Sequence, residues 1–208
     1  MNHAYSPHER ASNMLAPGSD HFQAAPSVRG ILKLLSLGPD DLVLDFSENR
    51  ALYATTIARF FSDSDGRGVV FTCDPSEAAL EEVERKTAQL GASHHFYPVL
   101  LDDTIPFQLP FHDEQLDAIL TTDRIFPSAG STPYLREFAR ILKPCGTLLL
   151  AQSTVKTTFR TPKSVTRLPL AADLSPFLKS AGFEILTPFD ARNYLWIIRA
   201  MKPVISFA

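Results

Sequence analysis

The sequence predicts an α/β fold with a doubly wound, mostly parallel seven-stranded sheet that ends in an antiparallel hairpin. Short apolar runs alternate with amphipathic helical segments along most of the chain, as in folds built from a parallel sheet. Glycine and proline punctuate these segments. The last two apolar runs follow one another with no helical segment between them, which is typical of a hairpin.

Five apolar runs have the length and composition of buried parallel strands. They are 42–46, 69–73, 96–101, 116–121 and 146–151. Pro98 interrupts the third run, so we expect that strand at an edge of the sheet, or Pro98 at an end of the strand. The closing runs, 183–186 and 194–198, are expected to pair as the hairpin.

Five further segments carry apolar residues at helical spacing. They are 28–37, 51–61, 77–90, 133–142 and 174–181. Ser76 is placed to cap the third of these helices, and Gly91 to end it. The polar segment 152–167 is expected to be an inserted loop. The chain is thus expected to form an N-terminal arm, residues 1–26, and one domain, residues 27–208.

Composition excludes several classes of function. A net charge of −3 and a pI near 6.1 provide no attraction to nucleic acid or to an anionic membrane. No apolar stretch approaches the roughly 18 residues that a membrane span needs, and residues 1–10 lack the apolar core of a secretory signal. Two cysteines are too few for a disulfide framework. We therefore expect a cytoplasmic protein that binds neither nucleic acid nor a membrane.

A metal site is not expected either. Three of the six histidines, His3, His8 and His21, lie in the N-terminal arm. They have no carboxylate or cysteine at ligand spacing beside them.

Several strings occur in a characteristic order. The first strand ends in Asp45 and is followed by the turn Phe46-Ser47-Glu48-Asn49-Arg50-Ala51, and the second ends in Asp74-Pro75. Residues 109–120, LPFHDEQLDAIL, lead into the fourth strand and are the most specific string; residues 135–148 and 178–184 continue the order. Together these strings resemble the class I S-adenosylmethionine-dependent methyltransferases, in their small-molecule, type 11-like branch. The resemblance covers 27–203 and implies a Rossmann-like methyltransferase fold.

The resemblance also implies a cofactor, S-adenosylmethionine, at the carboxyl ends of the strands. In the family, an acidic residue at the end of the first strand orients the following loop and contacts the amino group of the cofactor, and the turn after it lies beneath the cofactor. The second strand ends in a carboxylate that binds the ribose, and an acidic residue further along the chain contacts the adenine. The matching positions are Asp45, Ser47, Asn49, Asp74, Pro75, Asp102 and Asp103. Two alternatives stay open, because Asp74 can serve the N-terminus of the following helix and Asp102 and Asp103 can be plain surface carboxylates.

The turn after the first strand departs from the family. Where the family has Gly-x-Gly-x-Gly, this chain has Ser47, Asn49 and Ala51. Asn tolerates left-handed geometry and Ser is small, so the turn itself can form. Each added Cβ at a cofactor contact costs about 1 to 3 kcal/mol. Two or three of them would remove roughly two to six powers of ten in affinity.

The acceptor side of the site is less specific. Thr122, Asp123 and Arg124 follow the fourth strand and are candidates to face a methyl acceptor, with Asp123 as a general base. The alternative is a surface ion pair between Asp123 and Arg124. No catalytic residue is assigned, because alignment of a nucleophile with the methyl group can suffice.

Two functions therefore remain. One is a methyltransferase acting on a small-molecule acceptor. The other is a non-catalytic relative that has lost cofactor binding and serves as a binding or interaction module with a protein partner.

Overall fold

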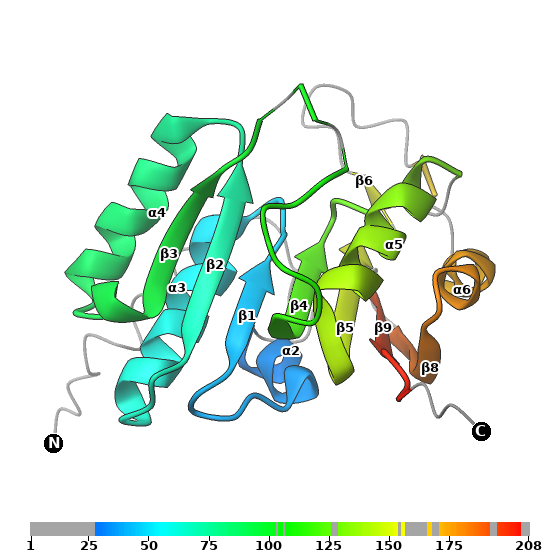
Figure 1. Ribbon diagram of the computed structural model, residues 1–208, viewed down its shortest axis with the longest axis horizontal. Helices are drawn as coiled ribbons and strands as arrows, with labels where there is room; N and C mark the ends of the chain where they lie inside the picture. The colour runs from blue at the N-terminus through cyan, green and yellow to red at the C-terminus, as the bar shows by residue number, and fades with distance from the viewer. Residues whose placement is uncertain are drawn as a thin grey trace, which may run out of the picture.

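A seven-stranded sheet with the order β3-β2-β1-β4-β5-β9-β8 forms the centre of the computed structural model (Figure 1). The structure describes residues 28–102, 104–105, 107–125, 129–153, 155–156, 166–167, 171–191 and 195–204. The expected arm, 1–26, lies outside these ranges, and with it the three histidines. The observed sheet confirms the predicted fold class.

The first five strands of this sheet run parallel to one another. They are β1 (Leu42–Asp45), β2 (Val69–Asp74), β3 (Phe96–Leu100), β4 (Leu116–Thr122) and β5 (Leu142–Ser153). β1 and β4 are central and nearly continuously buried, which is why their sequences are unbroken apolar runs rather than alternating ones. β3 lies at the edge, as expected from Pro98.

The C-terminal hairpin is formed by β8 (Glu184–Ala191) and β9 (Leu195–Met201), which pair antiparallel. β9 also pairs antiparallel with β5 and so attaches the hairpin to the parallel strands. The expected inserted loop is not wholly irregular, because β6 (Val155–Lys156) and β7 (Thr166–Arg167) pair within it as a separate two-stranded sheet.

Helices cover both faces of the sheet, with α5 and α6 in front and α2 and α3 behind in Figure 1. They are α2 (Val28–Leu35), α3 (Arg50–Asp63), α4 (Glu77–Gln89), α5 (Thr132–Ile141) and α6 (Ala171–Ser180), with short 3-10 turns η1 (Ser93–His95) and η2 (Ala129–Ser131). Ser76 caps α4 as expected, its hydroxyl oxygen accepting the Ala79 N–H at 3.3 Å. Gly91 follows α4 with a φ of +70°, a conformation that favours glycine.

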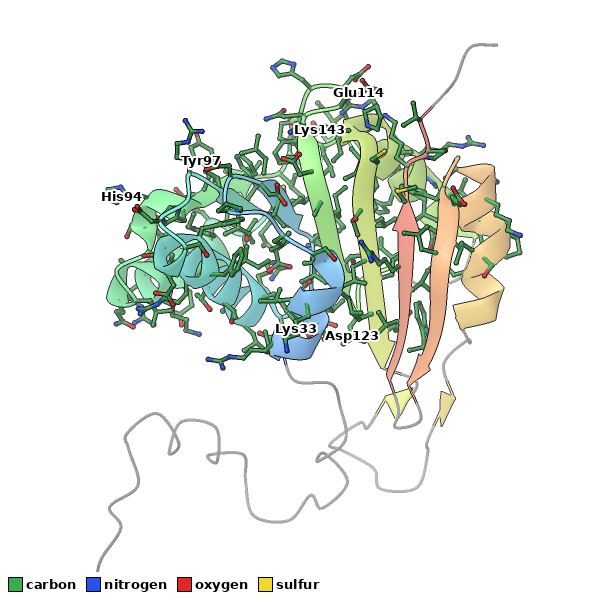
Figure 2. All side chains as sticks on the ribbon, turned by 90° about the horizontal axis from the view of Figure 1, so that it is seen from below. Lys33, His94, Tyr97, Glu114, Asp123 and Lys143 are labelled. Atoms are coloured by element: carbon green, nitrogen blue, oxygen red, sulfur yellow. The ribbon has the colours of Figure 1, made fainter. Side chains whose placement is uncertain are left out.

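The two helix layers enclose two separate apolar cores. The core between the sheet, α5 and α6 contains Phe46, Phe138 and Trp196, all buried. The core on the other face joins α2, α3 and α4 to the sheet through residues such as Ile31 and Ile57. In Figure 2, Glu114 and Lys143 lie at one end of the strands, and Asp123 lies at the other. The sheet is thus buried on both faces, and a ligand must approach it from an end of its strands.

The two cysteines lie apart in different environments. Cys73 is buried in β2, and burial raises the pKa of its thiol to about 12. Cys145 is exposed and has a φ of 65°. No helix in the described ranges is long and apolar enough to cross a membrane. Within the same ranges, His, Cys, Asp and Glu side chains form no group of three or more that could hold a metal ion.

Candidate functional site

The carboxyl ends of β1, β2 and β4 meet at one edge of the sheet. β2 and β4 flank β1 on opposite sides, and the order of the strands reverses between β1 and β4. Such a reversal is where open α/β sheets bind ligands. Asp45, Asp74 and Thr122 are the last residues of these three strands, so the fold brings the expected site residues together here.

Asp45 is fully buried at this edge. Its Oδ1 accepts the Ser47 N–H at 3.2 Å, whereas its Oδ2 has no hydrogen-bond partner within the described structure. Burial raises the pKa of Asp45 to about 7, against the opposing effects of the Ser47 hydrogen bonds and the Arg50 charge. The carboxyl group is therefore largely protonated below neutral pH.

The turn after β1 is held against β4 by its backbone. The Phe46 N–H donates to Leu120 O at 2.8 Å, and the Glu48 N–H donates to Thr122 O at 3.0 Å. The hydroxyl of Ser47 accepts the Thr122 N–H at 3.2 Å. Ser47 is buried, so its side chain is part of the sheet edge rather than a wall of an open cleft.

This turn forms without left-handed residues. Asn49 has a φ of −93°, and none of the residues 46–51 has a positive φ. The expectation that Asn49 serves by tolerating left-handed geometry is therefore wrong. The difference from a glycine turn lies in the Cβ atoms, and at Ser47 also in the hydroxyl that bonds to β4.

Asp74 is almost fully buried and has two partners. Its Oδ2 forms an ion pair with the guanidinium of Arg50, the first residue of α3. Its Oδ1 accepts the Ser76 N–H at 2.7 Å, just before α4. This second contact agrees with the alternative that the carboxylate serves the start of that helix. The carboxylate expected at the ribose is thus occupied by the chain's own groups.

Arg124 lies across the same edge. Its Cζ is 3.9 Å from the centre of the Phe46 ring, a cation–π contact. Its Nη1 donates a long hydrogen bond, 3.4 Å, to Cys73 O, next to Asp74. Burial and then the nearby charge of Arg50 lower the pKa of the guanidinium, which remains charged at neutral pH. Arg124 therefore connects the end of β4 to the end of β2.

The other expected residues lie around this centre. Asp102 is exposed and accepts the N–H and the hydroxyl of Thr104 at 2.8 and 2.6 Å, contacts that lower its pKa. Pro75 is exposed, Asp103 lies outside the described residues, and Asp123 is half-buried with a φ of 54°. Of the ten expected residues, Asp45, Ser47, Asp74, Thr122 and Arg124 surround the centre; Asn49 is exposed beside it.

Three residues of this edge have no counterpart in the sequence-based expectations: Phe46, Arg50 and Tyr53. Burial raises the pKa of Tyr53 to about 12, with the charges of Asp45 and Asp123 adding to the effect, so it remains a hydrogen-bond donor beside Thr122. Arg50 did carry a signal in the sequence. A cation in the first turn of a helix opposes the helix dipole, which indicates a carboxylate partner elsewhere.

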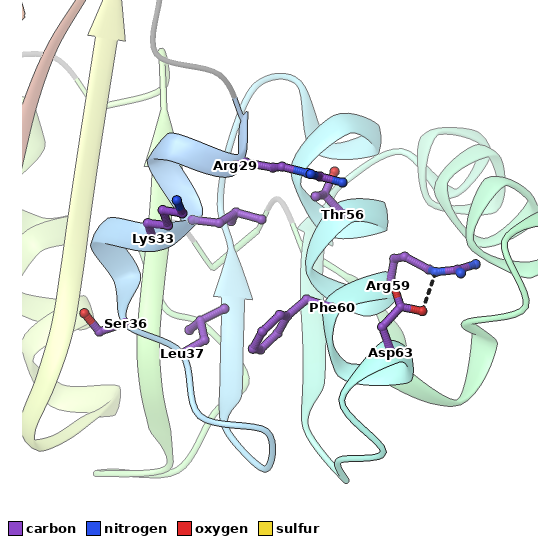
Figure 3. A pocket seen from close by; sticks show the side chains of 9 residues that line it. Arg29, Lys33, Ser36, Leu37, Thr56, Arg59, Phe60 and Asp63 are labelled. Carbon is purple, nitrogen blue, oxygen red and sulfur yellow. Dashed lines mark ion pairs between the residues drawn. The ribbon is translucent and has the colours of Figure 1, made fainter. Parts of the chain in front are cut away.

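A separate hollow of about 470 Å³ lies between α2 and α3 (Figure 3). Its apolar part is formed by Leu32, Leu37 and Phe60. Arg29 and Lys33 line it from α2, and the ion pair between Arg59 and Asp63 closes its α3 side at 2.8 Å. Because its α3 residues begin only at Thr56, more than one helical turn after Arg50, the hollow is distinct from the edge where β1, β2 and β4 end.

Comparison with known proteins relates the chain to methyltransferases. The model of a methyltransferase domain matches residues 51–150. The match begins at Ala51, so most of the altered turn precedes it. No curated protein matches the sequence.

Solved structures share the fold. The [4+2]-cyclase SpnF aligns with a TM-score of 0.69 at 20% identity, over 85% of this chain and 80% of its own. A SAM-dependent methyltransferase from Aquifex aeolicus aligns with a TM-score of 0.67 at 17% identity, over 96% of this chain and 100% of its own. Geranyl diphosphate C-methyltransferase from Streptomyces coelicolor A3(2), in complex with Mg2+, geranyl diphosphate and S-adenosyl-L-homocysteine, aligns with a TM-score of 0.65 at 13% identity, over 84% and 78%. The order of its motifs, the match of residues 51–150 to the domain model and this shared fold support membership of the class I S-adenosylmethionine-dependent methyltransferase family.

Proposed function

We propose that this chain is a non-catalytic member of its family that does not bind S-adenosylmethionine and acts as a binding or interaction module. The observation that carries the proposal is the ion pair between Arg50 and Asp74. Family membership alone does not decide the matter, because one fold hosts different chemistries. Among the structural neighbours, one is described as a [4+2]-cyclase and another as a C-methyltransferase.

The ribose of the cofactor would need the carboxylate of Asp74. Both oxygens of that carboxylate are engaged, one by Arg50 and the other by the Ser76 N–H. A ribose diol would have to displace a guanidinium from a nearly buried carboxylate. Breaking a buried, charged contact of this kind costs several kcal/mol, because it leaves a charge without its partner.

The charges of this edge also oppose the cofactor. S-adenosylmethionine carries a sulfonium, an ammonium and a carboxylate group, and its net charge is therefore positive. The edge presents the guanidinium groups of Arg50 and Arg124. Asp74 balances one of these cations, and the raised pKa of Asp45 keeps that carboxyl largely uncharged below neutral pH. A ligand with a net positive charge would therefore enter a site that already has excess positive charge.

The turn leaves little room as well. Ser47 is buried and bonded to β4, and Phe46 beneath Arg124 is buried too. With the ribose acceptor engaged, cations across the edge and side chains on the turn, the residues present do not fit S-adenosylmethionine in this arrangement.

One observation favours the second candidate, an active methyltransferase with a small-molecule acceptor. Oδ2 of Asp45 is buried without a hydrogen-bond partner in the described structure, and an ammonium group would satisfy it. This single acceptor stands against the engaged carboxylate of Asp74 and two guanidinium groups. We therefore place the active methyltransferase second.

Isothermal titration of the wild-type protein with S-adenosylmethionine and S-adenosyl-L-homocysteine tests the proposal. We expect no binding heat at protein concentrations well above micromolar. Arg50→Gln, which frees Asp74, serves as a comparison, and Asp74→Ala removes the expected ribose acceptor. Micromolar binding to the wild type that weakens in Asp74→Ala would overturn the proposal and restore the enzyme interpretation.

A further inference from the structure

Arg50 and Arg124 reach the same point of the sheet from different elements. Arg50 starts α3 and pairs with Asp74, the last residue of β2. Arg124 follows β4 and donates to Cys73 O, one residue earlier in β2. Two guanidinium groups therefore converge on consecutive residues at the end of one strand.

In the part of the chain that the structure describes, the hydrogen-bonding capacity of these two guanidinium groups is largely unused. A guanidinium has five N–H donors. Among the described residues, Arg124 makes one hydrogen bond, and it is long at 3.4 Å. The Nε of Arg50 is buried and also has no hydrogen-bond partner among the described residues. Partly buried cations with unused donors are a characteristic feature of oxyanion sites.

We propose that the edge between Arg50 and Arg124 binds a small organic oxyanion, a carboxylate or a phosphate ester with a flat apolar body. This site rests on the proposed function, because it replaces the cofactor at the same edge of the sheet. The charge preference of the edge is thereby reversed, from a cationic cofactor to an anionic ligand.

The surrounding charges leave room for an anion. Asp74 neutralises one of the two arginines, and Asp45 lies beneath the turn with a pKa of about 7. Asp123 faces the Tyr53 side of the edge, where its charge raises the pKa of that phenol. The group facing the β2 end is thus two guanidiniums and one carboxylate, with a net charge of +1.

The apolar body of the ligand has aromatic neighbours. The Phe46 ring, which carries Arg124 on its face, lies 5.5 Å from the ring of Tyr134, centre to centre. Tyr134 is half-buried and makes an edge contact at 4.9 Å with Phe107, which is 41% exposed. The half-buried ring of Tyr134 and the exposed ring of Phe107 suit a flat anion, because ring stacking and pairing with the two cations act on opposite ends of it.

Four small probes separate the contributions. Benzoate and phenyl phosphate carry a flat ring and an oxyanion, benzamide is the neutral counterpart of benzoate, and inorganic phosphate lacks the ring. We expect the two aromatic anions to bind the wild-type protein in isothermal titration and benzamide not to bind. If benzoate binds more tightly than phenyl phosphate, the ligand is a carboxylate; if phenyl phosphate binds more tightly, the ligand is a phosphate ester. Inorganic phosphate is expected to bind more weakly than phenyl phosphate.

Matched variants locate the site. Arg124→Gln should weaken binding of the preferred anion about tenfold or more, which is the loss of affinity expected when a charge-assisted contact is removed. Arg124→Lys keeps the charge and should retain part of the affinity. Arg29→Gln removes an exposed arginine from the hollow between α2 and α3 and should change the affinity less than twofold. Circular dichroism confirms that each variant is folded.

The proposal is wrong if neither aromatic anion binds the wild type, or if Arg124→Gln binds as tightly as the wild type. If Arg29→Gln loses affinity for the anion and Arg124→Gln does not, the anion binds in the hollow between α2 and α3, and the proposal is also wrong. S-adenosylmethionine is titrated separately, so its binding would refute the proposed function. If neither S-adenosylmethionine nor an aromatic anion gives binding heat, only this inference is refuted.

Discussion

Asp45 makes the stability of the domain depend on pH in an unusual direction. Its folded pKa of about 7 lies above the value of 3.8 for an exposed aspartate. The folded state therefore keeps a proton that the unfolded chain releases. The contribution of Asp45 to the free energy of unfolding is largest below about pH 4. It falls as the pH rises and is fully lost above about pH 7.

The size of the effect follows from the two pKa values. About three pH units at roughly 1.4 kcal/mol per unit give about 4 kcal/mol, of which about 3 kcal/mol is lost between pH 5 and pH 8. Asp45→Asn cannot ionise, so this loss should be absent from the variant. The buried amide has its own packing and hydrogen-bonding cost, but that cost does not change with pH and cancels from the slope.

Urea unfolding of the wild type and of Asp45→Asn, followed by circular dichroism at several pH values from 5 to 8, measures the difference. The free energy of unfolding should fall more steeply with pH in the wild type. Asp63→Asn, on the exposed end of α3, is the control and should parallel the wild type. Parallel curves for the wild type and Asp45→Asn would show that Asp45 is not held protonated and would refute this reasoning.

Two further substitutions test the structure outside the site. Cys145→Gly should stabilise the protein by about 1 kcal/mol, since Cys145 has a φ of 65° that glycine adopts without strain; thermal unfolding should show a melting temperature about 2 to 4 °C higher, and an unchanged or lower value would contradict it. Arg140→Ala should destabilise by about 2 kcal/mol, because Arg140 joins Glu137 and Asp113 and donates to Phe111 O at 2.9 Å. Urea unfolding measures that loss, and stability equal to that of the wild type would refute it.

Much of the fold could be predicted because its strands are buried on both faces. β1 and β4 are unbroken apolar runs, and Pro98 correctly indicated an edge strand. The start of β5 was missed. Residues 143 and 144, Lys and Pro, suggested that strand pairing begins only at Gly146, yet β5 begins at Leu142, which pairs with Leu116 beside an irregularity in β4.

The candidate site was predictable only in part. Residues at strand ends, such as Asp45, Asp74 and Thr122, follow from the rule that carboxyl ends of parallel strands share an edge. The ion pair of Asp74 with Arg50 could not be read from the chain, because it depends on the direction in which a helical side chain crosses to a neighbouring strand. The stacking of Arg124 on Phe46 is a tertiary contact of the same kind.

The ion pair between Arg50 and Asp74 also bears on how the domain behaves in a cell. A protein that binds a metabolite gains stability in proportion to the logarithm of the metabolite's concentration. Here a side chain of the protein occupies the carboxylate, and its local concentration is fixed by the fold. Under the proposed function, the folded population of this domain should therefore stay constant when the supply of S-adenosylmethionine rises or falls.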